Sequence, residues 1–327
     1  MKAINELLNI PVPSRNRYLL PASMLSAYDS LTEGIRNFKK YICLQDPCGD
    51  VERNLNLLLS FVVNDNPAAF WVGESYRYSL SDGTIDLIVD YIPKSESEEY
   101  AEKLINVVKK VDSVTEVTRD VPSVAVSVHD YLASTIIYDL NATLCHTAVG
   151  ALLQGRAVCD GIAAATSLML NHAGIKCETM SGKFRGSSEV WHAWNRVFCK
   201  DGTMHMDVTN DLQSKLGYVS HKYFFLSKEK AIKILSWMDD QEHNSDFDYY
   251  SRVGRYAESI GDVEKIMSDC AGRGISVAEM GVNSCLSEEQ LLDSVVTTYA
   301  PFRDNLSITY QLDRELNVFT YMVNAEE

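Results

Sequence analysis

Hydrophobic residues recur at helical spacing through much of the first third of the chain, and polar residues fill the positions between them. This pattern predicts helices over residues 24–43, 50–62 and 95–111. Two further segments flank the Ser-Asp-Gly turn at 81–83, and they are predicted to be strands over residues 68–80 and 84–92. The pattern therefore predicts an N-terminal α/β region over residues 1–122.

The middle of the chain alternates between helical and strand patterns. Helices are predicted over 123–138 and from Cys159 to near Gly174, which suits a helix end. A strand over 175–184 and a β-hairpin over 190–211 follow, with Asp201-Gly202 in the hairpin turn. We assign residues 123–235 to one core domain on this basis.

The last part of the chain changes character again. Residues 255–325 predict the order strand, helix, strand, helix, strand, strand. We therefore expect a small C-terminal α/β domain over residues 236–327.

Composition narrows the class of protein. The 327 residues suffice for two or three domains, and 46% hydrophobic with 23% charged residues is ordinary for a globular protein. A net charge of −15 argues against nucleic acid as a partner. We expect no membrane insertion, because no apolar run approaches about 18 residues. The start of the chain lacks the apolar segment of a signal peptide, so a cytoplasmic location is expected.

The cysteines show no metal-binding spacing. The chain has 8 cysteines without two short-spaced pairs, which favours reduced, mostly buried thiols and no structural metal. Cys159 differs because it opens a predicted helix, where unpaired backbone N–H groups stabilise a thiolate. A cysteine nucleophile also needs an imidazole and a group that orients the imidazole. His192 and Asp207, on the two arms of the predicted hairpin, can fill these roles.

The hairpin pattern supports this grouping only in part. A two-residue turn at Asp201-Gly202 pairs Arg196 with Asp207, and His192 then lies on the same face as Asp207. The separation along the strand is about 13 Å, so a bulge, a strong twist or another register must bring the two together. Two alternatives remain: Asp207 forms an ion pair with Arg196, and His192 is an ordinary core residue.

Four motifs in this order resemble the transglutaminase-like superfamily, whose fold is related to that of papain-like cysteine proteases. They are "GRAVCDGIAAA", "HAWNRV", "MHMDVTND" and "YFFLS", and the resemblance covers residues 129–228. The flanking segments are similar to those of bacterial multi-domain members. The resemblance implies Cys159 as nucleophile, His192 as its histidine and Asp207 as the acidic partner.

The resemblance also has departures and a weaker correspondence. Bacterial relatives often carry Tyr and Trp where this chain has Ile162 and Asn210, and we expect these changes to affect the pocket wall and packing rather than the triad. Gln154, five residues before the cysteine, resembles the papain-like oxyanion-hole glutamine. His129, His146 and His205 are expected to be structural.

The sequence thus predicts an α+β protein in which a nucleophile helix packs on an antiparallel sheet, flanked by N-terminal and C-terminal α/β regions. The expected activity is that of a cysteine protease, amidase or transglutaminase-like acyltransferase acting on a protein or peptide substrate. Hydrolysis of the thioester is slightly favoured over transamidation. The rival hypothesis is an inactive module that binds peptides or cell-wall fragments as a scaffold. No cofactor is expected, and no acidic loop suggests calcium.

Overall fold

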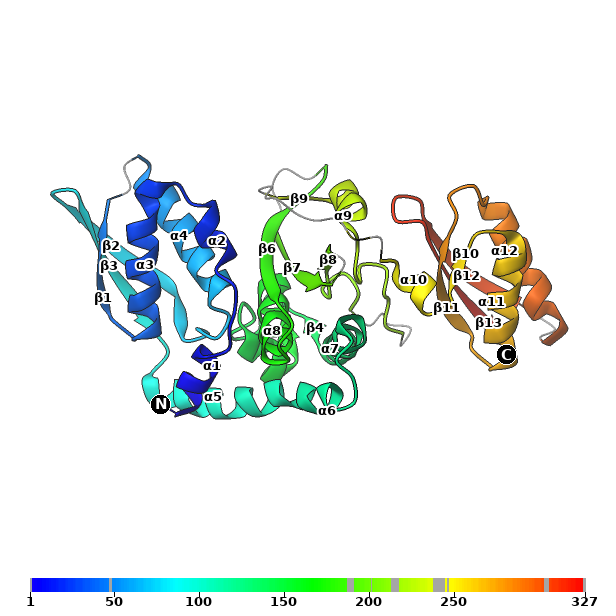
Figure 1. The fold of residues 1–327 in the computed structure, drawn as a ribbon, viewed down its shortest axis with the longest axis horizontal. Helices are drawn as coiled ribbons and strands as arrows, with labels where there is room; N and C mark the ends of the chain where they lie inside the picture. The colour runs from blue at the N-terminus through cyan, green and yellow to red at the C-terminus, as the bar shows by residue number, and fades with distance from the viewer. Residues whose placement is uncertain are drawn as a thin grey trace.

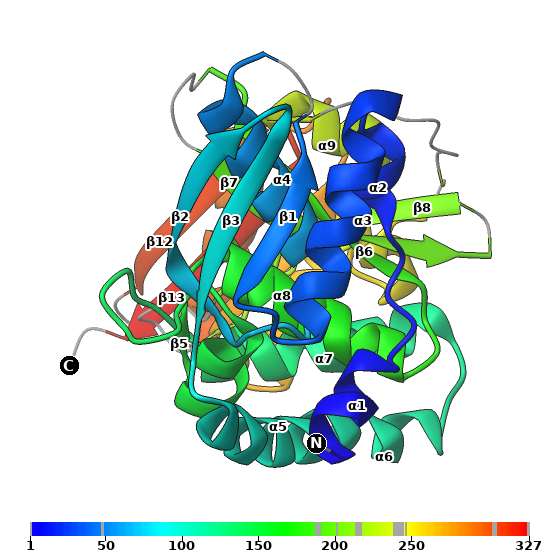
Figure 2. The same ribbon diagram turned by 90° about the vertical axis from the view of Figure 1, so that its left-hand side faces the viewer.

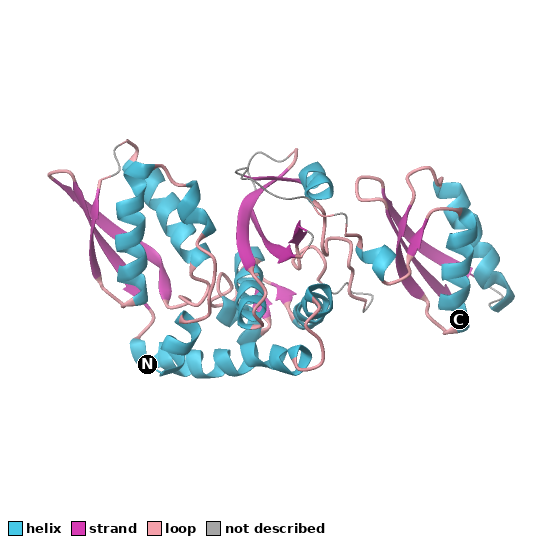
Figure 3. Cartoon of the chain, viewed as in Figure 1, coloured by secondary structure: helices cyan, strands magenta, loops and turns pink. Residues whose placement is uncertain are grey.

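The fold is taken from a computed structural model, which describes residues 2–46, 49–186, 191–200, 202–212, 218–237, 245, 247–302 and 306–325. Three α/β units follow one another along the long axis of the molecule (Figure 1). Each unit has its own sheet with helices against it, as the secondary-structure colouring of Figure 3 makes plain. All statements below refer to these residues.

The N-terminal unit is a small antiparallel sheet covered by helices. Its strands, in the spatial order β1-β3-β2, are β1 (Tyr41–Gln45), β2 (Val72–Ser81) and β3 (Thr84–Tyr91). Its helices are α1 (Lys2–Leu8), α2 (Arg15–Leu19), α3 (Ala22–Arg36) and α4 (Val51–Asp65). Figure 2 looks onto this unit, with α3 alongside the three strands.

The helix predicted over residues 24–43 is too long. Helix α3 ends at Arg36, and the chain turns at Phe38, whose φ is +55°. In β1 the burial alternates, with Ile42 and Leu44 inside. A run of only three or four apolar residues fits both the helical spacing and the alternation of a strand, so the sequence pattern did not separate β1 from the preceding helix.

The middle unit holds the predicted nucleophile helix. Its helices are α5 (Lys94–Val108), α6 (Asp112–Thr115), α7 (Val121–Thr135), α8 (Cys159–His172) and α9 (Lys228–Ile234), with a 3-10 turn η1 (Lys109–Val111) and a π-helix η2 (Gly150–Gln154). Strands β6 (Cys177–Phe184), β7 (Trp191–Cys199), β8 (Gly202–Met206) and β9 (Leu235–Trp237) form an antiparallel sheet in the order β8-β7-β6-β9. The short parallel pair β4 (Ile137–Tyr138) and β5 (Arg156–Ala157) leads into α8.

Helix α8 packs on the antiparallel sheet as predicted. Asn195, on β7, donates a side-chain hydrogen bond to the Ala163 carbonyl oxygen of α8 at 3.0 Å. The helix ends at His172, and Gly174 has the positive φ of +78° that ends many helices. Helix α7 stops at Thr135, earlier than the predicted 138, because the following residues pair with β5 instead.

The N-terminal and middle units share one continuous hydrophobic core. It runs from Ile4 through Trp71 and Leu104 to Leu168 and Phe225. Helix α5 contributes to this shared core and lies beneath both units in Figure 1. Because no polar layer divides this core, we expect the two units to unfold together.

The C-terminal unit has a separate core. Its elements are α10 (Tyr249–Arg252), β10 (Tyr256–Ala257), α11 (Ile260–Gly272), β11 (Val277–Val282), α12 (Glu288–Tyr299), the 3-10 turn η3 (Ala300–Phe302), β12 (Leu306–Asp313) and β13 (Val318–Ala325). From β10 onward this is the predicted order, with the sheet arranged β10-β11-β13-β12. Its core residues, among them Val263, Leu291 and Phe319, form their own cluster.

A polar contact joins the C-terminal unit to the middle one. The Glu279 carboxylate, on β11, accepts hydrogen bonds from Ser220 Oγ at 2.7 Å and from the His221 backbone N–H at 2.8 Å. It also accepts one from Tyr250 Oη at 2.6 Å. Leu226 and Val318 add an apolar contact beside it.

The observed architecture is the predicted α+β class, with a nucleophile helix on an antiparallel sheet and flanking α/β regions. The domain boundaries at 122 and 235 stay a prediction. Across the described residues, no helix combines the length and apolar character needed to cross a membrane.

The two hydrophobic cores make unfolding testable. Leu291→Ala should destabilise the C-terminal unit by about 2–5 kcal/mol, because it leaves a cavity in a separate core. All 4 tryptophans lie before residue 238, and only Trp237 packs against residues of the C-terminal unit, so their fluorescence monitors mainly the N-terminal and middle units. In urea, Leu291→Ala should shift part of the circular-dichroism transition and leave the fluorescence midpoint unchanged.

The matched variant is Leu168→Ala, in the shared core, which should move the fluorescence midpoint. Equal shifts of both signals by Leu291→Ala would show instead that the whole chain unfolds as one cooperative unit.

Candidate functional site

Cys159 is the first residue of α8. The preceding residue, Val158, has extended backbone angles (φ −108°, ψ −178°) and caps the helix without a side-chain hydrogen bond. Cys159 is a free, half-buried thiol. Because the first turn of a helix has unpaired N–H groups and the positive end of the dipole, this position favours a thiolate.

The start of α8 packs closely against the segment around Cys145. The Cys145 carbonyl oxygen accepts the Val158 N–H at 3.0 Å, and a side chain at Gly161 would collide with that same oxygen. The Asp160 carboxylate, next to the nucleophile in sequence, is bonded to His146 Nδ1 at 2.8 Å. Glycine at 161 therefore allows the close packing that fixes where the cysteine lies.

His192 and Asp207 lie together. His192 Nε2 and Asp207 Oδ2 are 2.7 Å apart, and their side chains are only 6% and 2% exposed. In the hairpin, Arg196 lies opposite His205 rather than opposite Asp207. This register differs from the predicted one by two residues, so it keeps both side chains on one face and halves their separation along the strand, from about 13 Å to about 7 Å.

The turn of this hairpin was only partly predicted. Gly202 pairs with Cys199, and the predicted turn residue Asp201 lies outside the described residues. The strand β8 ends at Met206, and the backbone N–H of Asp207 donates to the Tyr223 carbonyl oxygen at 3.1 Å. The chain therefore leaves the ladder at Asp207, which frees its side chain to reach His192.

The imidazole of His192 is held as a cation between two partners. Burial alone lowers the pKa of His192, but the Asp207 carboxylate and then the Cys159 sulfur, both within hydrogen-bonding reach, raise it to about 10. Nε2 faces Asp207, so Nδ1 is the ring nitrogen left for the sulfur. Phe184 stacks on one side of the ring with centroids 4.6 Å apart.

Asn210 is a partner of the triad that the sequence analysis misjudged. Its Nδ2 donates to Asp207 Oδ2 at 2.6 Å, and its backbone N–H lies 3.3 Å from the other carboxylate oxygen. The expectation that this residue affects the pocket wall rather than the triad is therefore wrong. A signal was present, because an amide three residues after an aspartate suits a hydrogen-bonded turn. Ile162, the other departure, is buried in the core.

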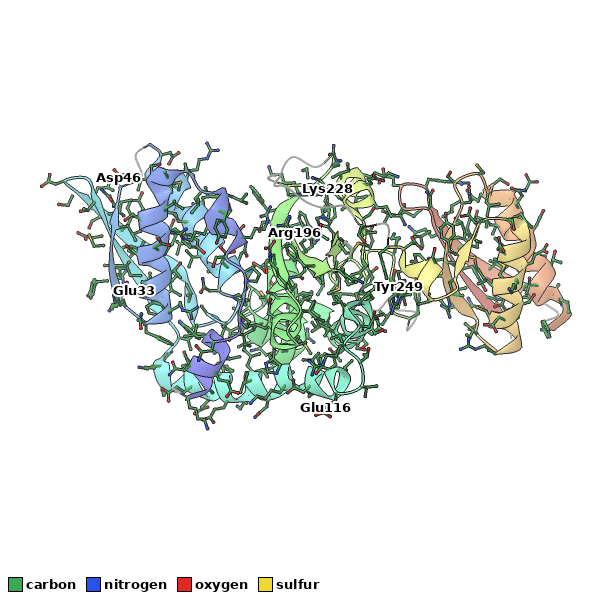
Figure 4. The ribbon with its side chains drawn as sticks, viewed as in Figure 1. Glu33, Asp46, Glu116, Arg196, Lys228 and Tyr249 are labelled. Carbon is green, nitrogen blue, oxygen red and sulfur yellow. The ribbon has the colours of Figure 1, made fainter. Side chains whose placement is uncertain are left out.

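Among the described residues, no ion pair joins Asp207 to Arg196, which was one of the two alternatives for the hairpin residues. Arg196, labelled in Figure 4, forms its ion pair with Glu178 on the neighbouring strand, with Nε and Oε2 3.0 Å apart. His205 Nδ1 accepts a hydrogen bond from Trp194 Nε1 at 2.9 Å. Asp207 is thus left to His192 and Asn210.

The described part of the chain gives no contact that supports Gln154 as the oxyanion-hole residue. Gln154 is exposed at the end of η2, and among the described residues no hydrogen bond joins it to the triad. In the first turn of α8, the Gly161 N–H bonds the Asp160 side chain and the Ile162 N–H bonds the Val158 carbonyl. The Cys159 and Asp160 N–H groups therefore stand as backbone candidates for an oxyanion.

A second histidine–aspartate pair lies on the same turn. His129 Nε2 is 3.2 Å from Asp211 Oδ2, and both side chains are fully buried. Burial alone lowers the pKa of His129, but Asp130 and Asp211, at the two ring nitrogens, raise it to about 9. Burial raises the pKa of Asp211 to about 6. Of His129, only a structural role was predicted.

Comparison with known proteins identifies the middle of the chain. Residues 108–208 match the family description "Transglutaminase-like superfamily", and this range contains Cys159, His192 and Asp207. These residues form a transglutaminase-like domain. The family assignment made from the four sequence motifs is therefore confirmed.

The other comparisons with this chain give weaker matches or none. A solved structure described as that of a TGase is 14% identical and has a TM-score of 0.33, and the match covers 64% of this chain. The chain spans 56% of the length of that structure. No curated protein matches the chain.

Alkylation tests the thiolate–imidazolium arrangement. With the pKa of His192 raised to about 10, the imidazole beside Cys159 stays positively charged from pH 6 through pH 9. Because a positive charge beside a thiol favours its thiolate, iodoacetamide at pH 6 should modify Cys159 faster than the other cysteines, since an ordinary thiol with a pKa of about 8.5 is almost fully protonated there. Peptide mapping separates Cys159 from the other seven thiols.

His192→Ala should slow Cys159 alkylation at pH 6 by at least about 10-fold and less at pH 9, because only the low-pH thiolate needs the cation. His172→Ala, which removes another partly buried histidine paired with an aspartate, should leave the rate unchanged. Slow reaction of wild-type Cys159 at pH 6 would contradict the ion pair.

Proposed function

We propose that the protein is a cysteine-dependent acyl-transfer enzyme that acts on a carboxamide or peptide bond of a protein or peptide substrate. The transglutaminase-like domain implies cysteine-dependent acyl transfer or hydrolysis. One observation carries the proposal for this chain: the buried His192 imidazole is bonded to Asp207 on one side and faces the Cys159 sulfur on the other. That is the arrangement a thiol nucleophile requires.

The proposed first half-reaction forms a thioester. The Cys159 thiolate attacks the carbonyl carbon, and the oxyanion that forms accepts hydrogen bonds from N–H groups in the first turn of α8. The carbon–nitrogen bond then breaks, and His192 transfers its proton to the departing amine or ammonia. Asp207, supported by Asn210, keeps the imidazole in the tautomer and orientation that this transfer needs.

The second half-reaction releases the acyl group. Neutral His192 accepts a proton from water, the resulting hydroxide attacks the thioester, and the carbon–sulfur bond breaks to give the acid and the Cys159 thiolate. A primary amine in place of water would give transamidation. Hydrolysis is favoured because the site is open: Cys159 is only half-buried, and Tyr138 beside it is exposed. Keeping water from a thioester requires an enclosed site.

Tyr138 lies close to the nucleophile. Burial, and then negative charge at Cys159, raises the pKa of its hydroxyl. Trp191 directly precedes His192, and the Lys183 ammonium lies 5.1 Å from its ring centroid. The exposed ring of Tyr138 provides apolar surface for a substrate beside the reacting sulfur, whereas Trp191, next to His192 on β7, belongs to the opposite face of the sheet.

Activity should be sought with a panel of peptides and glutamine carboxamides, by following ammonia or amine release. Cys159→Ala should lower kcat by about 10⁴-fold or more, and Asp207→Asn by about 10²–10⁴-fold, because both remove groups needed in the transition state. Intact-mass spectrometry of quenched reactions should detect the acyl group on the wild-type protein. Adding a primary amine then measures how the thioester divides between water and amine.

Cys199→Ala is the matched control, because it removes another half-buried cysteine that lies outside the triad, and it should retain full activity. An acyl adduct that persists in Cys159→Ala would place the nucleophile elsewhere. Substrate binding without turnover, unaffected by Cys159→Ala, would support the scaffold hypothesis instead.

A further inference from the structure

Three side chains outside the triad bring metal-binding atoms together at the junction with the C-terminal unit. His129 and Asp130 lie on α7, and His221 lies on the segment before α9, 91 residues beyond Asp130. His129 Nδ1 is 2.9 Å and His221 Nε2 is 2.8 Å from the same oxygen, Asp130 Oδ1. All three ligand atoms lie within 4.8 Å of one another.

Asp211 orients the first of these histidines. Its Oδ2 lies 3.2 Å from His129 Nε2, so the ring presents Nδ1 to Asp130. Asp211 is itself fixed, because both of its carboxylate oxygens accept the Tyr223 backbone N–H, at 3.1 and 2.9 Å. A carboxylate on the far nitrogen of a histidine is the usual second-shell partner of a metal ligand, where it fixes the tautomer and the ring.

His221 is held as firmly. Its ring stacks on Tyr249 at 4.7 Å between centroids and packs on His129 at 5.0 Å. Its backbone N–H is bonded to Glu279 of the C-terminal unit. Tyr249 lies between the middle and C-terminal units in Figure 4, so the cluster sits where these units meet.

Charge and access both suit a cation. Asp130, Asp211 and Glu279 surround two imidazoles, in a chain whose net charge is −15. Asp130 is 48% exposed, which gives an ion a path to the cluster and leaves space for a water ligand, whereas His129 is fully buried. Two imidazoles and one carboxylate are ligands that Zn²⁺ accepts, with water in the fourth position.

We propose that His129 Nδ1, the Asp130 carboxylate and His221 Nε2 bind a divalent transition metal, Zn²⁺ or its cobalt substitute, in a four-coordinate site completed by water, and that the proton on His129 Nδ1 is released to solvent when the metal binds. Zn–N and Zn–O bonds of about 2.0–2.2 Å separate tetrahedral ligands by about 3.4 Å. The two short contacts to Asp130 must open slightly and the imidazoles must approach, which side-chain rotations can supply. The metal would link α7 to the segment that carries the C-terminal unit, independently of the acyl-transfer chemistry.

Cobalt binding tests the site directly. The full-length Cys159→Ala protein is used, because a thiolate–imidazole pair can itself bind these metals. Titration with Co²⁺ should produce the visible absorption bands of a four-coordinate ion with one equivalent bound, and Zn²⁺ should remove them. His221→Ala in the same background should weaken Co²⁺ and Zn²⁺ binding by at least 10-fold, measured by absorption and by calorimetry. Asp130→Asn, at a half-exposed position, should weaken it in the same direction.

The chain supplies a matched control. His172 and Asp112 form a pair with Nε2 2.9 Å from Oδ1 and exposures of 20% and 49%, almost the same as His221 and Asp130 at 2.8 Å, 18% and 48%. His172→Ala removes such a pair where the described residues supply no third ligand, so it should leave Co²⁺ affinity unchanged.

The result that would overturn the proposal is equal Co²⁺ affinity in Cys159→Ala and Cys159→Ala/His221→Ala, with far-ultraviolet circular dichroism showing both to be folded. Absence of visible bands in the parent protein would do the same, and the cluster would then be a hydrogen-bonded network only. If His221→Ala unfolds the protein, Asp130→Asn decides by the same two readouts. None of these results depends on finding a substrate.

Discussion

The buried contact between His192 and Asp207 constrains the rest of the candidate site. A carboxylate that is almost excluded from water is costly unless it is paired, and here it is satisfied by an imidazole and by Asn210. Holding this contact at 2.7 Å requires the β7–β8 register, the departure of the chain from the sheet at Asp207 and the backbone bond to Tyr223. The sheet thus positions the His192 imidazole, and α8 positions the Cys159 sulfur beside it.

Sequence patterns predicted the parts of this arrangement that depend on periodicity and local chemistry. The alternation along β7 placed His192 and Asp207 on one face, and the start of α8 at Cys159 followed from the motif around it. Alternation does not determine the strand register, however. A shift of two residues keeps His192 and Asp207 on the same face of the sheet but changes the distance between them. The register is set where Cys199 pairs with Gly202, and no periodic signal in the sequence distinguishes this pairing from the predicted one. Local pattern also failed at β1, where only Ile42 and Leu44 mark the strand.

Packing between residues far apart in the chain could not be predicted from the sequence, for a different reason. The hydrophobic core runs unbroken from Ile4 to Phe225, so the N-terminal unit and the transglutaminase-like domain are joined by packing between residues far apart in the chain. Likewise, His129 and His221 meet only because α7 and the segment before α9 lie side by side. Ligand spacing along a sequence detects metal sites built within one loop or helix, and this cluster has its third member 91 residues away.

One short turn connects the two histidine–aspartate pairs. Asp207 and Asp211 lie four residues apart, and each is hydrogen-bonded to a buried histidine. Asp207 contacts His192 on the sheet, and Asp211 contacts His129 on α7. Within this turn the backbone N–H groups of Asn210 and Asp211 bond the carbonyls of Asp207 and Val208, so the turn moves as a unit. The same backbone hydrogen bonds thus help to hold both carboxylates against their histidines.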